Sequence, residues 1–320
     1  MAIQELVRDV RRGQPRAIAR AISLAEDGGA PARELFKKLF PFRKDSSILG
    51  ITGSPGTGKS TLVDQIISRL RSARKKVGVV AIDPSSPFSG GAILGDRIRM
   101  MRHSVDPGVF IRSMATRGRL GGLARATGEA VAVFEAAGKD FVLVETVGVG
   151  QDEVDVVKLA DLVVVVLTPG AGDDIQAFKA GLMEIADVFV INKADAPGAQ
   201  KLAQQLEAML EVGFPGRRPI PVVKTIATTG EGVEALVEEV RGILRSRPPG
   251  FREARRKRLL SWMLRDIVQE ALFELLACRI PEAEFERCLD SLYDRETDPY
   301  SAADGLLGWL KKDLSGVRPH

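Results

Sequence analysis

The fold is decided by the stretch Ile48-Leu49-Gly50-Ile51-Thr52-Gly53-Ser54-Pro55-Gly56-Thr57-Gly58-Lys59-Ser60. Its first part predicts a buried strand, and its last eight residues match the pattern GxxxxGK[ST] between that strand and a predicted helix. In such a loop, main-chain amides close around phosphate oxygens, and the start of the following helix offers free N–H groups to an anion. The stretch predicts a nucleotide site, with Lys59 on the β- and γ-phosphates and Ser60 on Mg²⁺. The residues expected at the nucleotide are Gly53, Ser54, Pro55, Gly56, Thr57, Gly58, Lys59, Ser60 and Thr61.

Short β-branched runs alternate with amphipathic segments of helix length from about residue 47 to residue 244. This alternation predicts βαβ units, and therefore an α/β fold with a mostly parallel central sheet flanked by helices. Several of the runs are almost purely Val, Ile and Leu, as expected for strands covered on both faces. The expected strands are Ile48–Thr52, Val77–Asp83, Phe141–Thr146, Leu162–Thr168, Val188–Asn192 and Val222–Ile226, with Val109–Ser113 as a short edge strand.

The flanking regions predict helical extensions on both sides of this core. Residues 1–45 form a helical N-terminal extension that ends in a turn at Pro41. The core then occupies residues 46–247, and Arg247-Pro248-Pro249-Gly250 breaks the chain because neither proline continues a helix. Residues 248–320 carry a broad apolar helical stripe between Leu259 and Leu276. The stripe fits packing on its own core or a homodimer interface, and we favour the homodimer because exposed apolar stripes mark partners.

A second motif, Asn192-Lys193-Ala194-Asp195, ends a later apolar strand and indicates which base is bound. Asp195 can accept hydrogen bonds from the N1–H and exocyclic amine of guanine, which adenine does not offer in that geometry. We expect Lys193 to lie along the base and Asn192 to tie this loop to Gly53–Ser60. Ala227, after the next strand, is a weaker candidate for a main-chain contact to guanine O6.

Two carboxylates are expected at the carboxyl edge of the sheet, where ligands bind. Asp83 ends the second strand and Glu145 ends the Phe141–Thr146 strand, so both are candidates for the Mg²⁺ shell. The Gly148 amide is placed to contact a γ-phosphate, which would make residues 145–152 sensitive to hydrolysis. For the two carboxylates the alternative is helix capping or a strand-end turn.

Composition narrows the class of protein further. Apolar residues make up 45% of the 320 residues and charged residues 28%, which indicates a folded globular chain. The net charge is +4, with basic residues near Arg11–Arg20 and Arg252–Arg258, but aromatic residues that stack on bases are too scarce to favour nucleic-acid binding. Two isolated cysteines, no signal-peptide pattern and no long apolar run predict a cytoplasmic chain without a membrane segment.

Five motifs in order resemble the MeaB/ArgK-type GTPases, the chaperones of adenosylcobalamin-dependent methylmalonyl-CoA mutase. They are the Gly53–Ser60 loop, Asp83–Arg97, Glu145–Gln151, Pro169–Asp173 and Asn192–Asp195. The resemblance spans the whole chain and implies a homodimeric P-loop GTPase that binds GTP, GDP and Mg²⁺. It also implies that the mutase is the partner, and that this GTPase gates cofactor loading and protects the mutase.

The resemblance also assigns roles to single residues. It implies that Asp83, Asp96 and Glu145 are metal and switch carboxylates, and that Lys179 belongs to a third switch that communicates with the mutase. We expect Lys59, Asp96, Glu145 and Lys179 to serve catalysis, although Lys179 also fits a solvated helix lysine.

The sequence departs from the family pattern at Asp152 and at Ala177-Phe178. No glutamine directly follows Gly148, so no residue is assigned to position the attacking water, and slow intrinsic hydrolysis is expected. A nickel-insertion metallochaperone GTPase is the first alternative, but the Cys/His clusters that select nickel are missing from the sequence. A kinase associated with amino-acid transport is the second, and it would use ATP. His103 is expected to be an ordinary surface or core histidine.

Overall fold

The computed structural model describes residues 2–83, 100–115, 122–146, 159–170, 182–213 and 219–314. The chain divides into two compact units, residues 1–256 and 257–320. The limits expected from sequence, at 45/46 and 247/248, stay predictions. The expected breaks in helical structure are present, because α11 ends at Ser246 and α12 begins at Phe251, on either side of the two prolines.

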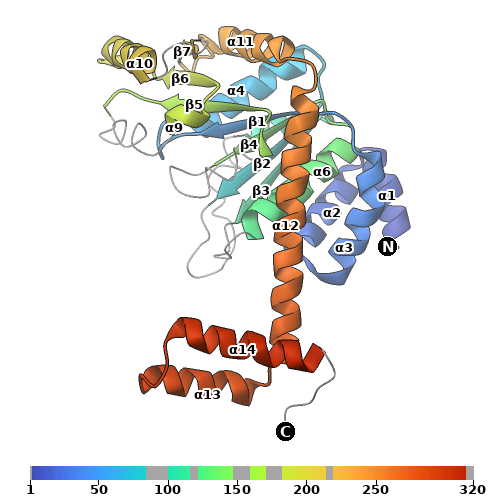
Figure 1. Ribbon diagram of the computed structural model, residues 1–320. Helices are drawn as coiled ribbons and strands as arrows, with labels where there is room; N and C mark the ends of the chain where they lie inside the picture. Colours follow the sequence, from blue (N-terminus) through green and yellow to red (C-terminus); the bar gives the residue numbers. More distant parts are fainter. Residues whose placement is uncertain are drawn as a thin grey trace. The chain divides into compact units, whose positions relative to one another are not determined.

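A parallel sheet forms the centre of the first unit (Figure 1). In the described residues it has seven strands in the order β3-β2-β4-β1-β5-β6-β7, and each strand runs parallel to its neighbours. The short strand expected at an edge is β3, which lies at one edge. The strands are β1 Ser47–Thr52, β2 Val77–Asp83, β3 Val109–Ala115, β4 Phe141–Glu145, β5 Leu162–Leu167, β6 Val188–Asn192 and β7 Val222–Thr225.

Helices cover both faces of this sheet, which confirms the α/β class. On one face, α4 (Lys59–Ser72) and α11 (Val233–Ser246) contribute apolar side chains to a single core cluster with the strands. On the other face, α6 (Gly122–Ala136) and α10 (Ala199–Gly213) form the second cluster. Every residue of β1, β4, β5 and β6 is buried, as a sheet covered on both faces requires.

The N-terminal extension is helical, as expected, and packs outside α6 (Figure 1). Its apolar side chains join the same core cluster as α6, which explains why these helices fold onto the sheet unit. The helices are α1 Ile3–Arg11, α2 Pro15–Asp27 and α3 Gly29–Leu39, followed by the short 3₁₀ helix η1 Phe40–Phe42; η2 Met101–His103 and α9 Leu182–Ile185 complete the first unit.

An aspartate directly precedes each of β4, β5 and β6 and fixes where neighbouring strands begin. Each carboxylate accepts a hydrogen bond from a main-chain N–H at the start of an adjacent segment. The pairs are Asp140 with Lys76, Asp161 with Ile48 and Asp187 with Val163, at 2.7, 2.8 and 2.9 Å. Burial raises the pKa of Asp161, and the Ile48 N–H opposes that shift.

Part of the basic run at Arg252–Arg258 is engaged within the first unit. Arg252 approaches Ser47 Oγ at 3.3 Å, and Arg256 pairs with Asp45 and Glu135. Glu135 is 2% exposed, and burial raises its pKa although Arg43 also pairs with it. These contacts give several of the basic side chains a structural role at the amino edge of the sheet.

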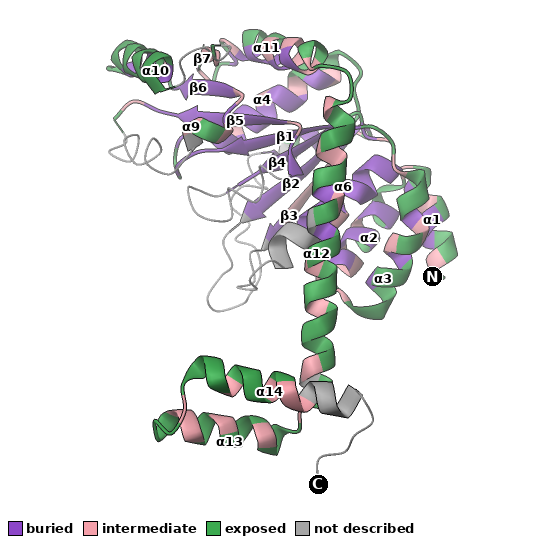
Figure 2. Cartoon of the chain, in the orientation of Figure 1, coloured by how far each residue is buried: buried purple, intermediate pink, exposed green. Residues whose placement is uncertain are grey.

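The second unit contains most of α12 (Phe251–Arg279), then α13 (Glu282–Tyr293) and α14 (Pro299–Leu314). Figure 2 shows that these helices are largely exposed or half-buried. Leu264 is 62% exposed and Phe273 is 71% exposed, while α13 has no buried residue among those described. The homodimer expected from this stripe stays a prediction. Among the described residues, no helix has the length and apolar character required to span a membrane.

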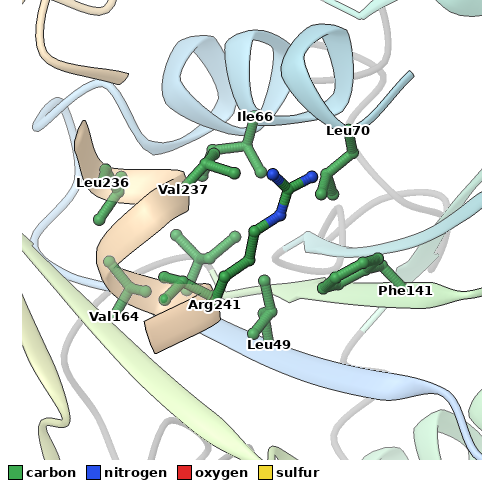
Figure 3. Close-up of a pocket in the computed structure, with 10 residues that line it drawn as sticks. Leu49, Ile66, Leu70, Phe141, Val164, Leu236, Val237 and Arg241 are labelled. Carbon is green, nitrogen blue, oxygen red and sulfur yellow. The ribbon is translucent and has the colours of Figure 1, made fainter. Parts of the chain in front are cut away.

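A small apolar cavity lies between α4, α11 and the sheet (Figure 3). Its volume is about 10 Å³, at the lower limit for one water molecule. Leucine, isoleucine, valine and phenylalanine side chains line it, with Arg241 as the polar member. A water molecule there would find few partners, so the cavity is a packing defect and not a ligand site.

Candidate nucleotide site

The Gly53–Ser60 loop connects β1 to α4, as the motif requires. Two of its glycines cannot be replaced without a clash. Gly53 has φ +143°, and a Cβ there would lie 2.1 Å from the Val166 carbonyl oxygen. Gly58 has φ +88°, and a Cβ there would lie 2.4 Å from Asn192 Nδ2. The loop therefore needs glycine for its backbone conformation and for the close approach of β5 and of the base motif.

Lys59 and Ser60 open α4 at the phosphate-binding loop. Lys59 is 6% exposed, and its ammonium donates to the main-chain oxygens of Gly53 at 2.7 Å and Ser54 at 3.1 Å. Thr57 Oγ1 also donates to the Ser54 oxygen, at 2.9 Å. A buried cation and a helix N-terminus thus converge on one loop, which is the arrangement that binds a polyphosphate. Pro55 and Gly56 are exposed on its rim, and Thr61 is half-buried.

Ser60 and Glu145 meet at the carboxyl edge of the sheet. Ser60 Oγ donates to Glu145 Oε1 at 2.6 Å, and both side chains are buried. A hydroxyl and a carboxylate are hard oxygen donors, so this pair fits Mg²⁺. Asp83 ends β2 two residues beyond Ala81, the register partner of Glu145. Within the described ranges no group of three or more His, Cys, Asp or Glu residues gathers in metal-binding geometry.

Several expected site residues fall outside what the structure describes. Asp96, Gly148 and Lys179 lie in undescribed segments, and for Asp83 the backbone alone is described. Their roles stay predictions.

Asn192 joins three loops. Its link to the phosphate loop is the contact that we expected from the sequence. Its Nδ2 donates to the Thr57 oxygen at 2.8 Å, so the base motif is tied to the phosphate loop. Its Oδ1 accepts from Thr225 Oγ1 at 3.2 Å and from the Ala227 amide at 3.0 Å. The Ala227 N–H, expected to contact guanine O6, is therefore already engaged by Asn192, and its contact with the base stays a prediction.

Lys193 and Asp195 lie on the exposed side of the same loop. Lys193 has φ +55° and donates from Nζ to the Gly56 oxygen at 2.9 Å, which places its aliphatic chain over the phosphate loop. A left-handed backbone conformation is unusual for lysine. The next amide, that of Ala194, donates to the Thr225 oxygen at 3.0 Å and helps to hold it. Asp195 is exposed and accessible to a base.

One polar cluster near the site was missed from sequence. Asp64, on α4, contacts Arg102 and His103 just before β3. The signal was available, because polar residues recur at helical spacing on one face of the predicted helix, at Ser60, Asp64, Ser68 and Arg71. His103, expected to be a surface or core histidine, is buried at 8% exposure.

Comparisons with known proteins agree on one family. The model of the family described as methylmalonyl Co-A mutase-associated GTPase MeaB matches residues 18–279. A protein of Pyrococcus abyssi named "Putative GTPase" is 50% identical over 313 residues, with 95% of this chain and 96% of that protein covered. The mitochondrial methylmalonic aciduria type A homolog of Mus musculus is 34% identical over 259 residues, with 75% and 62% covered. The crystal structure of an LAO/AO transport system kinase matches with a TM-score of 0.68 at 25% identity, covering 97% of both chains.

Proposed function

Because the chain belongs to the methylmalonyl-CoA mutase-associated GTPase MeaB family and is a GTPase, we propose that it serves an adenosylcobalamin-dependent acyl-CoA mutase of the methylmalonyl-CoA mutase type. In this role it gates cofactor loading and protects the mutase. The carrying observation is the extent of the family match, which runs beyond the nucleotide-binding core to residue 279, through α12. The mouse relative, whose name refers to methylmalonic aciduria, supports the same partner.

GTP and GDP occupy the site formed by the Gly53–Thr61 loop and the Asn192–Asp195 motif in this proposal. The support is geometric, since Asn192 links the two motifs through the Thr57 oxygen. Asp195 reads the guanine edge and Lys193 lies along the base. The Gly148 amide contacts the γ-phosphate.

In this proposal Mg²⁺ would be held by Ser60 and Glu145, and Asp83 and Asp96 would act on it directly or through water. The bound ion would neutralise charge on the β- and γ-phosphates during hydrolysis. The protein's own contribution is position: Lys59 brings a cation to the phosphates, and the Ser60–Glu145 hydrogen bond keeps both oxygen donors at one edge. Lys179 adds charge stabilisation when the mutase is bound.

Two substitutions test the nucleotide site. Asp195→Asn should weaken GTP binding and favour xanthosine nucleotides, because an amide can donate to the xanthine carbonyl. Lys59→Ala should abolish binding of Mg²⁺-GTP while leaving the circular dichroism spectrum unchanged. Calorimetry that finds wild-type GTP affinity in either variant would refute the corresponding assignment.

The partner is tested by measuring GTP hydrolysis with and without an adenosylcobalamin-dependent mutase. We expect the mutase to bind this protein and to accelerate hydrolysis, and we expect Lys179→Ala to lose the acceleration while keeping GTP affinity. Lys201→Ala, at an exposed lysine of α10 outside the nucleotide motifs, is the control variant. Equal rates with and without the mutase, together with no binding, would refute the chaperone role.

The oligomeric state and the identity of the nucleotide are also testable. Light scattering should give a homodimer, and a monomeric wild-type protein would contradict the role of the exposed stripe on α12. The structural neighbour is named a transport system kinase, so ATP is the competing nucleotide. Faster hydrolysis of ATP than of GTP would favour a kinase associated with amino-acid transport. Binding of nickel by the protein would favour a nickel-insertion metallochaperone.

A further inference from the structure

Two Arg–Asp pairs fasten the connection between β2 and β3 to the helix that starts at the phosphate loop. In the described residues this connection resumes at Met100, which is fully buried, and passes through η2 into β3. Arg71 of α4 donates to both carboxylate oxygens of Asp106, at 2.8 and 2.9 Å. Asp64 of α4 pairs with Arg102 in the opposite sense, with the acid on the helix and the base on the connection.

The pair of Asp64 with Arg102 has more hydrogen-bonding partners than the pair of Arg71 with Asp106. Asp64 is 6% exposed, and its Oδ1 accepts from Arg102 Nε at 2.8 Å while Oδ2 contacts the same guanidinium. His103 Nε2 lies 3.0 Å from Asp64 Oδ1 and 3.1 Å from the Asp64 main-chain oxygen. Both of these neighbours are oxygen acceptors, so they are placed to accept a hydrogen bond from Nε2. Ser68 Oγ donates to the Asp64 main-chain oxygen at 3.0 Å and accepts from Arg102 at 2.9 Å.

The cluster lies on the face of α4 that also carries Ser60, Ser68 and Arg71 at helical spacing, and Asp64 is buried there. A buried carboxylate loses its hydration, and apolar residues of similar size would often be as stabilising. Because the Arg71–Asp106 pair already fastens the same connection, general stability does not explain a second pair whose carboxylate is more deeply buried. What distinguishes Asp64 is its place one helical turn after Ser60, about 6 Å along the axis, whereas Arg71 lies about 16 Å away.

We propose that Asp64 is a positioning residue for GTP hydrolysis, which holds Arg102 and His103 against the turn of α4 directly below Ser60. This inference rests on the proposed nucleotide site. The cluster holds Arg102 and His103, which follow the buried Met100, in fixed register with Lys59 and Ser60, the residues that face the phosphates and Mg²⁺. GDP is held by the phosphate loop and the base motif, which Asn192 ties together through Thr57 and Ala227, neither of which belongs to the cluster. Loss of the cluster therefore slows hydrolysis and leaves GDP binding intact.

The test separates the hydrolysis rate from nucleotide affinity in four proteins. Asp64→Asn and Arg102→Gln remove the charge pairing, and Arg71→Gln is the matched control because it breaks the equivalent pair farther along the same helix. Single-turnover hydrolysis of Mg²⁺-GTP is compared with the calorimetric Kd for GDP in each variant and the wild type. We expect a fall in rate of about tenfold for Asp64→Asn and Arg102→Gln, with the GDP Kd within about twofold, and a wild-type rate for Arg71→Gln.

Three results would overturn the inference: an unchanged rate in Arg102→Gln, an equal fall in Arg71→Gln, or a parallel loss of GDP affinity. Arg102 has a half-exposed side chain, so its variant decides the question if Asp64→Asn does not fold. Lys59→Ala, measured together with these variants, tests the proposed nucleotide site itself. If it binds GTP normally, the proposed nucleotide site is wrong whatever the Asp64 variants do.

Discussion

Asn192→Ala is expected to lower both the stability of the sheet unit and its nucleotide affinity. The side chain is 2% exposed and makes three hydrogen bonds, to Thr57, Thr225 and Ala227. A neutral hydrogen bond contributes about 1 kcal/mol net, and a buried group left without a partner costs about 1–3 kcal/mol. The three contacts together predict a loss of about 3 kcal/mol in the free energy of unfolding. That loss corresponds to a change of about a hundredfold in the folding equilibrium.

The assay must report on the first unit, because both tryptophans, Trp262 and Trp309, lie in the second. Hydrogen exchange of the β1 and β6 amides in the nucleotide-free chain gives the free energy of opening for the sheet itself. Calorimetry with GDP then measures affinity, which should fall at least tenfold because the phosphate loop and base motif are no longer joined.

Gln200→Ala is the matched control for this substitution. Gln200 is an exposed amide that accepts a hydrogen bond from Lys224, so its loss should change stability by less than about 0.5 kcal/mol. A loss below about 1 kcal/mol in Asn192→Ala, or wild-type GDP affinity, would refute the view that this side chain holds the site together.

Three further substitutions follow from the packing. Gly58→Ala should abolish nucleotide binding, because its Cβ would lie 2.4 Å from Asn192 Nδ2; wild-type GDP affinity in calorimetry would contradict this. Burial lowers the pKa of Lys139 from 10.5 to about 8, so the folded state resists protonation and stability rises between pH 8 and 10.5. Lys139→Met should therefore stabilise the protein below pH 8 by about 1–3 kcal/mol and flatten that rise in urea titrations. The Gly108 oxygen, to which Lys139 Nζ donates at 3.0 Å, keeps the Val77 N–H as a donor in this variant; an unchanged pH profile would count against the prediction. Val237→Ile should fill the cavity between α4 and α11 and raise stability by about 0.8 kcal/mol, whereas a lower melting temperature would show overpacking.

Local patterns were enough to predict the elements and the two nucleotide motifs. Runs such as Leu162–Leu167 identify buried strands because a sheet covered on both faces demands apolar residues at successive positions. The Gly53–Ser60 loop was equally predictable, since its residue types and spacing are local, although the close approach of Val166 and Asn192 to its glycines was not. Pro248 and Pro249 marked the break before α12 for the same local reason.

The tertiary structure alone decided which distant residues meet. Nothing local in the sequence orders the strands β3-β2-β4-β1-β5-β6-β7, because order depends on how each helix crosses the sheet. Folding brings Asn192 to the Thr57 oxygen across 135 residues, and Asp64 to His103 across 39. A buried polar group such as Asp64 needs a partner, but the sequence does not say which one. The partner's identity is fixed when the packed backbone brings one donor within hydrogen-bonding distance.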